Sequence, residues 1–478
     1  MRAWSALLVT AALLAGCLDD APNEERPDPE PEPRLPQAGP GTFYHLAGGV
    51  PADPAALAGD NTAFLARGGY HGIGFSTFEP TIGSTSSGAL FMTNFRGTGA
   101  GTHIIRGTGN GTVWEDVGPT LGPLPVKPVP NSNDPFLYVD PWTDRIYDFD
   151  MCLILSGFCV AWSDDDGGTW LTQSVATGEA PALDHQSLAS APPPEDVTTV
   201  GYPNVLVFCV NRGTTATGSW CSSSLDGGIA WTPLVPGFPA EDPQCSGLSG
   251  HVVGSPDGRF YRGNPSCGGA AVYRSDDGGL TWSEHTIPGT DPMGHEIAAA
   301  VDETGNVYAF WIGSDGLPYL AASRDHAETW TQPMMVGAPG ITATGFPTAV
   351  GGASGRVAFA YIGTGVEGGY GGNQQNAEWS GYVGAATDAF ANGTLITTVA
   401  VNAAADPLAT GRCGDVRCGG FGDFIDITID FEGRPWAALS HNGHGDTGIV
   451  GTFTEGPALR GELRPLPKIV LGGPDSLG

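Results

Sequence analysis

The amino-acid sequence predicts an all-β chain folded as a single β-propeller of four-stranded antiparallel blades. Three observations lead to this prediction: a turn motif that recurs along the chain, a series of hairpins at similar intervals, and a composition that disfavours helices. The 478 residues include 74 Gly and 40 Pro, which interrupt helices wherever they fall. Short strands of β-favouring residues, such as Asn306 to Trp311, run between the turns. A repeated unit of this kind indicates one large domain rather than several small ones.

The turn motif has the pattern Ser-x-Asp-x-Gly-x-Thr-Trp and occurs four times. Its Ser and Asp side chains can accept hydrogen bonds from the backbone N–H groups of a tight turn, Gly supplies positive φ, and Trp covers the turn with apolar surface. Ala230 replaces Thr in the second copy, and Ala327 replaces Gly in the fourth. The residues expected to build these turns are Ser163, Asp165, Gly167, Trp170, Ser224, Asp226, Trp231, Ser275, Asp277, Gly279, Trp282, Ser323, Asp325 and Trp330.

The spacing of the repeats predicts the number of blades. The motif aspartates at 165, 226, 277 and 325 lie 61, 51 and 48 residues apart, which suits one four-stranded blade with its loops. Seven strand-turn-strand hairpins follow the same rhythm, around residues 88–91, 144–147, 204–207, 258–261, 305–308, 355–358 and 433–436. We therefore expect seven blades, with six as the alternative. The last blade would take outer strands from 448–453 and 466–471, unless residues 42–46 close the ring instead.

These motif residues resemble the Asp-box, or bacterial neuraminidase repeat, of sialidase-like β-propellers. The resemblance implies that the turns lie away from any active site. Sialidases hold their substrate with arginines, one of them in a Phe/Tyr-Arg-Ile-Pro motif, and only Phe95-Arg96-Gly97-Thr98 comes near that motif here. No sialidase catalytic residue is therefore carried over to this chain. The arginines that follow hairpin turns, at 145, 259, 356 and 434, are interpreted as solvated turn residues.

The N-terminal segment predicts export and a lipid anchor. Residues 1–16 have a basic start and a short apolar stretch, as in a signal peptide, and Leu14-Ala15-Gly16-Cys17 resembles a bacterial lipobox. The resemblance implies that Cys17 is lipidated; the alternative is an ordinary signal peptide with an incidental Cys. Residues 17–40 form a Pro- and Glu-rich tether, and 41–478 the propeller. We expect a bacterial cell-envelope protein at the outer membrane or cell surface, attached to the membrane through the lipid alone.

The cysteines agree with an extracytoplasmic location. Without Cys17, eight of the nine remain, and they fall into close pairs along the chain. A zinc site is a weaker interpretation, because no pair is a Cys-x-x-Cys with a matching partner. We predict four local disulfides: Cys152 with Cys159, Cys209 with Cys221, Cys245 with Cys267, and Cys413 with Cys418.

The charge limits the partners. The formal net charge of −31 should repel nucleic acids and anionic lipid surfaces. We expect a monomer whose ligand is a glycan or a protein.

The start of the first strand of each blade predicts a binding site. In a propeller, these strands line the central channel, and the residues that precede them face its mouth. Six of the seven blades place a carboxylate or an imidazole there, while the remaining blade has Phe346. The predicted rim residues are Glu79, Asp134, Asp184, His185, His251, His295, Glu296 and Asp423.

Three histidines at this rim, His185, His251 and His295, make a divalent metal a candidate cofactor. Imidazole suits transition metals, and carboxylates suit Ca²⁺. The competing interpretation is structural: Asp before a strand often caps a turn, and polar side chains can simply hydrate a channel.

Two functions remain open from the sequence. The favoured one is a lipoprotein whose propeller binds a glycan or protein ligand at the channel mouth without a complete catalytic set. The alternative is a glycan-active hydrolase of sialidase-like type that uses paired rim carboxylates. Whether the chain is an enzyme is left undecided by the residues, because a fold hosts many activities.

Overall fold

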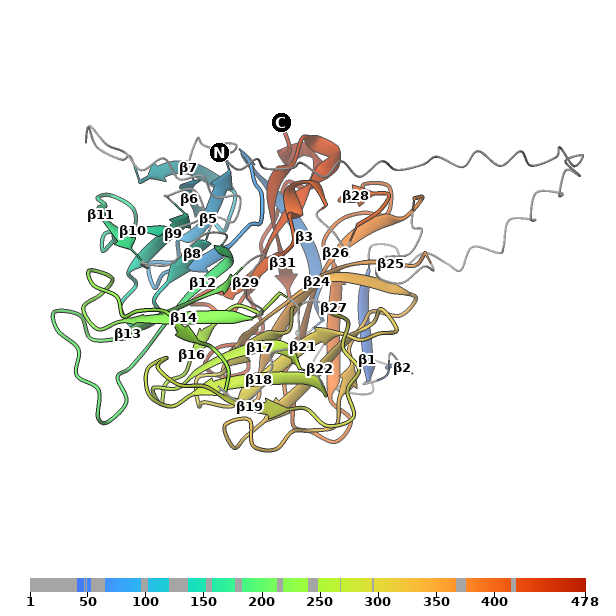
Figure 1. Cartoon of the computed structure of the whole chain (residues 1–478). Coiled ribbons are helices and arrows are strands. Elements are labelled where there is room, and N and C mark those ends of the chain that lie inside the picture. Colours follow the sequence, from blue (N-terminus) through green and yellow to red (C-terminus); the bar gives the residue numbers. More distant parts are fainter. Residues whose placement is uncertain are drawn as a thin grey trace, which may run out of the picture. The chain divides into compact units, whose positions relative to one another are not determined.

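A computed structural model describes residues 41–46, 48, 50–52, 65–95, 102–119, 136–151, 157–176, 183–212, 218–239, 248–266, 268–294, 296–366, 375–413 and 418–478. These residues form seven β-sheets, each with four antiparallel strands as its basic unit, and almost no helix. The predicted all-β, seven-bladed propeller is confirmed, and the six-bladed alternative is wrong (Figure 1). No helix among the described residues is long and apolar enough to cross a bilayer.

The first three blades follow one another along the chain, each beginning with its innermost strand. Blade one contains β4 (Ile82–Ser84), β5 (Leu90–Phe95), β6 (Thr102–Thr108) and β7 (Val113–Gly118). Blade two contains β8 (Phe136–Val139), β9 (Ile146–Met151), β10 (Gly157–Ser163) and β11 (Leu171–Ala176). Blade three contains β12 (Leu183–Ala191), β13 (Val205–Arg212), β14 (Ser219–Ser224) and β15 (Val235–Pro236).

The next three blades keep the same order. Blade four contains β16 (Val253–Gly254), β17 (Phe260–Ser266), β18 (Gly269–Ser275) and β19 (Ser283–Thr286). Blade five contains β20 (Ala298–Val301), β21 (Val307–Ile312), β22 (Pro318–Ser323) and β23 (Met334–Met335). Blade six contains β24 (Ala343–Gly351), β25 (Val357–Thr364), β26 (Glu378–Ala386) and β27 (Leu395–Ala400), extended by β1 (Thr42–Leu46), β2 (Val50–Pro51) and β28 (Ala409–Thr410).

Blade seven closes the ring with a strand from the other end of the sequence. Its strands are β29 (Asp426–Ile429), β30 (Pro435–His441), β31 (Thr447–Glu455) and β3 (Arg67–Ser76). The expected inner three strands are confirmed, but both predictions for the fourth are wrong. Residues 42–46 pair with β27 instead, and 466–471 form no strand; there, Leu466 and Ile469 donate backbone hydrogen bonds to Gly456 and Thr454 and pack on the core.

The closing strand is rich in Gly because its neighbours approach its backbone closely. A Cβ atom at Gly68 would lie 2.7 Å from Val399, and one at Gly72 would lie 2.5 Å from the backbone oxygen of Ser476, in η4 (Gly473–Ser476). Side chains at these positions would therefore push β3 away from the propeller.

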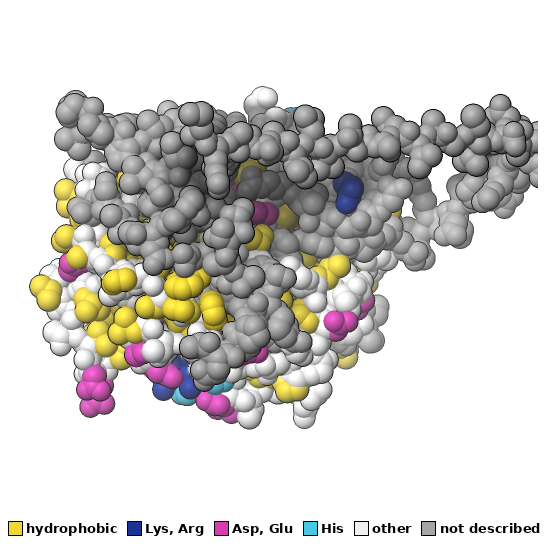
Figure 2. Space-filling model, viewed as in Figure 1, with side chains coloured by type: hydrophobic (Ala, Val, Ile, Leu, Met, Phe, Trp, Pro, Cys, Tyr) yellow, Lys and Arg dark blue, Asp and Glu magenta, His cyan; other side chains and the backbone are white. Residues whose placement is uncertain are grey.

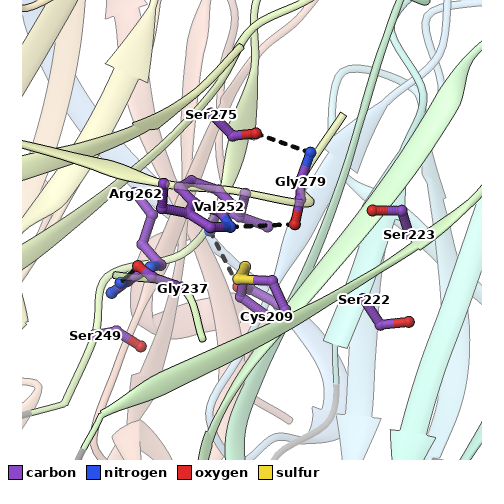
Figure 3. The surroundings of a disulfide bond; sticks show 12 residues. Cys209, Ser222, Ser223, Gly237, Ser249, Val252, Arg262, Ser275 and Gly279 are labelled. Atoms are coloured by element: carbon purple, nitrogen blue, oxygen red, sulfur yellow. Dashed lines mark hydrogen bonds between the residues drawn. A yellow bond between two sulfur atoms is a disulfide. The ribbon is translucent and has the colours of Figure 1, made fainter. Parts of the chain in front are cut away.

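The four recurring turns have one hydrogen-bond pattern. In the third copy, Asp277 Oδ1 accepts from the backbone N–H of Thr281 at 2.9 Å, and Oδ2 accepts from its hydroxyl at 2.6 Å. Ser275 Oγ accepts from the N–H of Gly279 at 2.9 Å (Figure 3). In the fourth copy, Ala327 takes the Gly position with φ 71° and still donates to Ser323 at 2.9 Å. The side chains therefore hold the turn even where Gly is missing.

Apolar side chains of adjacent blades fill the space between the sheets. Between blades two and three, Phe149 stacks on Phe158 with ring centroids 4.9 Å apart and contacts Phe208 at 5.0 Å. Both blades contribute to one buried cluster with Trp231 at its edge. Aromatic burial of this kind stabilises the propeller between blades rather than at its axis.

Two predicted disulfides are present in the described part of the chain. Cys209 and Cys221 are directly opposite each other on β13 and β14 (Figure 3), and Cys413 is bonded to Cys418. Cys159 is also disulfide-bonded. The other three predicted cysteines, Cys152, Cys245 and Cys267, lie outside the described residues, as do Cys17 and the predicted signal peptide and tether.

The arginines after the hairpin turns are not simply solvated. Arg434 is fully buried and donates to the backbone oxygens of Phe453 and Pro467. Arg145 lies over the ring of Tyr202 at 4.3 Å and forms an ion pair of 2.6 Å with Asp164. The interpretation as solvated turn residues is wrong for Arg434, because its guanidinium connects blade seven to the C-terminal segment.

Candidate functional site

The two ends of the blades carry different residues. In an antiparallel blade, the turn after the first strand and the turn after the third strand lie at the same end. The ion pair between Arg145, after β8, and Asp164, after β10, shows this directly. The four recurring turns, which follow the third strand of a blade, therefore lie at the end opposite to where the innermost strands begin. The predicted rim residues all come just before or at the start of those innermost strands.

The backbone bends sharply at this rim. Glu79, His185 and Phe346 have left-handed conformations, with φ of 50°, 55° and 56°. In β12 and β24 these residues fall within a register shift, between Asp184 and Ser187 and between Gly345 and Thr348. A bulge re-aims a side chain relative to a regular strand. Non-Gly residues in this conformation cost about 1–3 kcal/mol each and are concentrated at functional sites.

His185 is the centre of the polar cluster at the rim. Its Nε2 lies 3.1 Å from Glu296 Oε2, and its Nδ1 lies 3.9 Å from Asp423 Oδ1. The imidazole ring of His251 is 5.3 Å away, centroid to centroid. These four side chains come from blades three, four, five and seven, so the ring of blades brings them together.

Glu79, from blade one, lies against the segment that leads to Asp423. Its side chain packs against Gly422, where a Cβ atom would lie 2.1 Å from its Cγ, and its backbone N–H donates to Gly420 at 3.2 Å. Gly420 belongs to η2 (Gly419–Phe421), the turn that leads to Asp423. A side chain at Gly422 would displace Glu79, so this Gly is required for the close approach.

Burial affects the protonation of the Glu296 carboxyl group. Glu296 is 4% exposed, and loss of solvent raises the pKa of its carboxyl above the ordinary value. The hydrogen bond with His185 opposes this rise, while the nearby Asp423 carboxylate adds to it. A carboxyl group in such surroundings is protonated more readily than an exposed one.

Aromatic rings surround the two imidazoles. Phe424 contacts His185 and His251 edge to face, with centroids 5.2 and 4.8 Å apart. Phe136, from β8, contacts His251 in the same way at 5.0 Å. Both Phe side chains are buried, so they fix the imidazole orientations and exclude water from one side of the cluster.

A cavity of about 490 Å³ extends along the innermost strands from this cluster. Glu296, His251 and Asp426 line one end, whereas Trp142 and Phe431 line the end near the hairpin turns. Its walls between these ends are mostly apolar, with Ile82, Leu137, Leu188, Ala299, Ala349 and Ile427 among them. The end near the hairpin turns also has charged side chains, among them Asp144, Glu303 and Arg460. A cavity of this size, with apolar walls between polar ends, is typical of a small-ligand site.

Part of the cluster has the composition of a metal site. One ligand atom from each of His185, His251 and Glu296 can be chosen so that all lie within 4.8 Å of one another. Two imidazoles and a carboxylate suit a transition metal. The third residue of the group is Glu296, whereas the predicted His295 lies outside the described residues.

The structure brings together four of the eight predicted rim residues, His185, His251, Glu296 and Asp423, and it places Glu79 against Gly422, next to Asp423. Asp134 lies outside the described residues, as does the side chain of Asp184. Three further residues of the site were not predicted: Phe136, Phe424 and Asp426. Asp426 had a signal in the sequence, since it is the acidic first residue of a short strand with Ile at two of its other three positions.

Among known proteins, the chain is similar to solved structures at low sequence identity. Comparison with protein-family models gives no match, and comparison with curated proteins gives none either. Solved structures with a similar fold include the Aleuria aurantia lectin in complex with Fucα1-6GlcNAc, with a TM-score of 0.43 and 11% identity over 68% of this chain and 96% of that one. The NanB sialidase of Streptococcus pneumoniae has a TM-score of 0.41 and 10% identity over 87% and 98%.

A third similar structure is the intramolecular trans-sialidase of Ruminococcus gnavus, with a TM-score of 0.37 and 12% identity over 88% of this chain and 97% of that one. The arrangement of the sheets itself defines the class, a seven-bladed β-propeller of four-stranded antiparallel blades.

Proposed function

We propose that this protein is a ligand-binding propeller that recognises a neutral glycan at the end of the axial cavity lined by His251 and Glu296, beside His185 and Asp423. The convergence of these side chains from four blades carries the proposal. Carboxylates accept hydrogen bonds from sugar hydroxyls, imidazoles can donate or accept them, and neighbouring aromatic rings can pack on the apolar faces of a sugar.

The charge of the site argues for a neutral rather than an anionic sugar. The polar residues that form the cluster are acids and histidines, and the chain has a net charge of −31. A carboxylated sugar would be repelled by Asp423 and by the field of the whole protein.

Binding to an array of neutral and acidic glycans tests this proposal, followed by calorimetric titration with the best glycan. We expect Asp423→Asn and His251→Gln to weaken binding of a neutral glycan at least about tenfold, since each removes or alters a hydrogen-bonding group. The matched control is Asp475→Asn, an exposed residue near the C-terminus. Unchanged affinity in both site variants, or binding of acidic glycans alone, would refute the assignment.

One observation favours a second candidate, a glycan hydrolase. Glu296 is a buried carboxyl with a raised pKa, as a general acid requires, and Asp423 lies close enough to affect that pKa. Turnover of a fluorogenic glycoside panel by the wild type, abolished in Glu296→Gln, would establish this function instead of simple binding. No turnover by the wild type would exclude it for those glycosides.

A further inference from the structure

A second group of side chains of metal-ligand type lies apart from the polar cluster at the rim, which is called the axial cluster below. One ligand atom from each of Asp406, His441 and His444 can be chosen so that all lie within 4.8 Å of one another. Asp406 belongs to the segment between β27 and β28 of blade six. His441 ends β30 of blade seven, and His444 ends η3 (Asn442–His444), the turn that follows.

Asp406 is held through both oxygens. Its Oδ1 lies 2.9 Å from His441 Nε2, and its Oδ2 accepts a hydrogen bond of 2.6 Å from the hydroxyl of Tyr70 in β3. An outer hydrogen bond of this kind orients a carboxylate for metal binding and is typical of metal ligands. The carboxylate therefore has a fixed direction before any ion arrives.

The two histidines have different environments. His441 is 2% exposed, and its Nδ1 is buried without a hydrogen-bond partner among the described residues. His444 is exposed, with its ring centroid 4.7 Å from that of His441 at an interplanar angle of 88°. The hydrogen bond between His441 and Asp406 does not require a second imidazole beside it. The position of His444 is therefore not explained by that pair, and it suits a third metal ligand.

Hydrogen bonds to neighbouring residues fix the turn that carries His444. Asn442 donates to the backbone oxygen of Cys418 at 2.9 Å and accepts from the N–H of Gly420 at 3.0 Å. Cys418 is in turn bonded to Cys413. After His444, Gly445 and Asp446 reverse the chain with φ of 67° and 56°. The spacing of the two imidazoles is thus set by covalent and hydrogen-bonded neighbours, which pre-organises the site.

We propose that Asp406, His441 and His444 bind a Zn²⁺ ion, with Tyr70 as a positioning residue. Two imidazoles and one carboxylate leave a fourth position for water, a donor set that suits Zn²⁺. The ion connects the segment between β27 and β28 of blade six, the inner part of blade seven and the closing strand β3. It would stabilise the ring at the point where the two ends of the fold meet.

Competition with a chromophoric zinc chelator tests this proposal on the full chain without a polyhistidine tag. The background variant His251→Ala removes one ligand of the axial cluster, so that the remaining zinc binding reports the second group. We expect one bound Zn²⁺ and a higher melting temperature with zinc. His444→Ala and Asp406→Asn in this background should each weaken zinc binding at least tenfold and abolish the rise in melting temperature. Tyr70→Phe should weaken binding about tenfold or more, since it removes an outer-shell partner.

The matched control is His326→Ala, which removes a histidine outside both groups. It should bind zinc as the background variant does. Because His444 is exposed, its removal leaves the fold intact, which circular dichroism can check. Equal zinc affinity in His444→Ala, Asp406→Asn and the background would overturn the proposal, as would the absence of zinc binding by the background. Loss of zinc binding in these variants would support the zinc site. It would not bear on glycan binding at the axial site, which the glycan array tests separately.

Discussion

Asp426 places a carboxyl group at the same end of the axial cavity as Glu296 and His251. Its Oδ2 accepts a hydrogen bond of 3.0 Å from the backbone N–H of Ile82, so it connects blade seven to blade one. Burial raises the pKa of this carboxyl to about 7, and the nearby Glu296 adds to the rise. The residue is therefore both a structural link between two blades and an acid that titrates near neutral pH.

The pH dependence of stability should reveal this group. Between about pH 4 and pH 7, the unfolded chain loses the Asp426 proton while the folded chain keeps it, so this residue lowers the free energy of unfolding as pH rises. Asp426→Asn removes the effect and keeps an acceptor for Ile82. The stability of the variant relative to the wild type should rise from pH 4 to 7 and then level off, as measured by urea unfolding. Parallel curves for the two proteins across this range would contradict the assignment, and Asp475→Asn serves as the flat control.

Part of the site could be predicted from residue positions alone. His185, His251 and Glu296 were identified because each precedes or begins an innermost strand, and a propeller places all such positions at one mouth. Their mutual distances depend on bulges and blade tilt, which the repeat spacing does not encode. Phe136 and Phe424 were missed because a Phe beside a strand normally indicates core, and their contact with imidazoles is visible only in three dimensions.

The closing strand shows where sequence patterns fail at the level of elements. All seven predicted hairpins correspond to the first and second strands of a blade, because turn residues and alternating apolar residues mark them locally. The pattern of β3, with Gly68, Gly69 and Gly72, indicates a loop by propensity. Its strand conformation is imposed by pairing with β31 and by close neighbours on both sides, which are tertiary constraints.

Truncation separates the roles of β1 and β3. A chain that begins at Leu65 keeps β3 but loses β1 and β2, which extend the outer edge of blade six. We expect it to unfold in one cooperative transition at a reduced temperature. A chain that begins at Thr77 lacks β3, exposes the edge of β31 and should lose cooperative unfolding. Calorimetry on both chains tests this, and a cooperative transition at the wild-type temperature for the shorter one would show that β3 does not close the ring.

At the scale of the whole molecule, charge and attachment determine which surfaces the protein can meet. On the face drawn in Figure 2, Asp and Glu side chains are scattered among hydrophobic and neutral ones. With a net charge of −31, the protein should be repelled from anionic lipid surfaces. Attachment to the envelope would therefore need a covalent lipid, which we propose is carried by Cys17.

The lipid anchor can be tested by phase partitioning. The full chain, expressed in a bacterium that processes lipoproteins, should enter the detergent phase of a Triton X-114 extract, because acyl chains supply the membrane affinity that the acidic surface lacks. Cys17→Ser should move it to the aqueous phase. Partitioning of the variant into detergent to the same extent as the wild type would show that Cys17 is not the attachment point.

The ring of blades is closed by two strands, β3 and β31, of which one is synthesised early and the other late. Arg67 at the start of β3 pairs with Glu455 at the end of β31, so the ribosome finishes almost the whole chain before the two can meet. Until then, both strand edges are open to other chains, and contacts between such distant segments form slowly. A propeller exported as an unfolded polypeptide would have to complete this step beyond the inner membrane, where chaperones that shield strand edges would decide its yield.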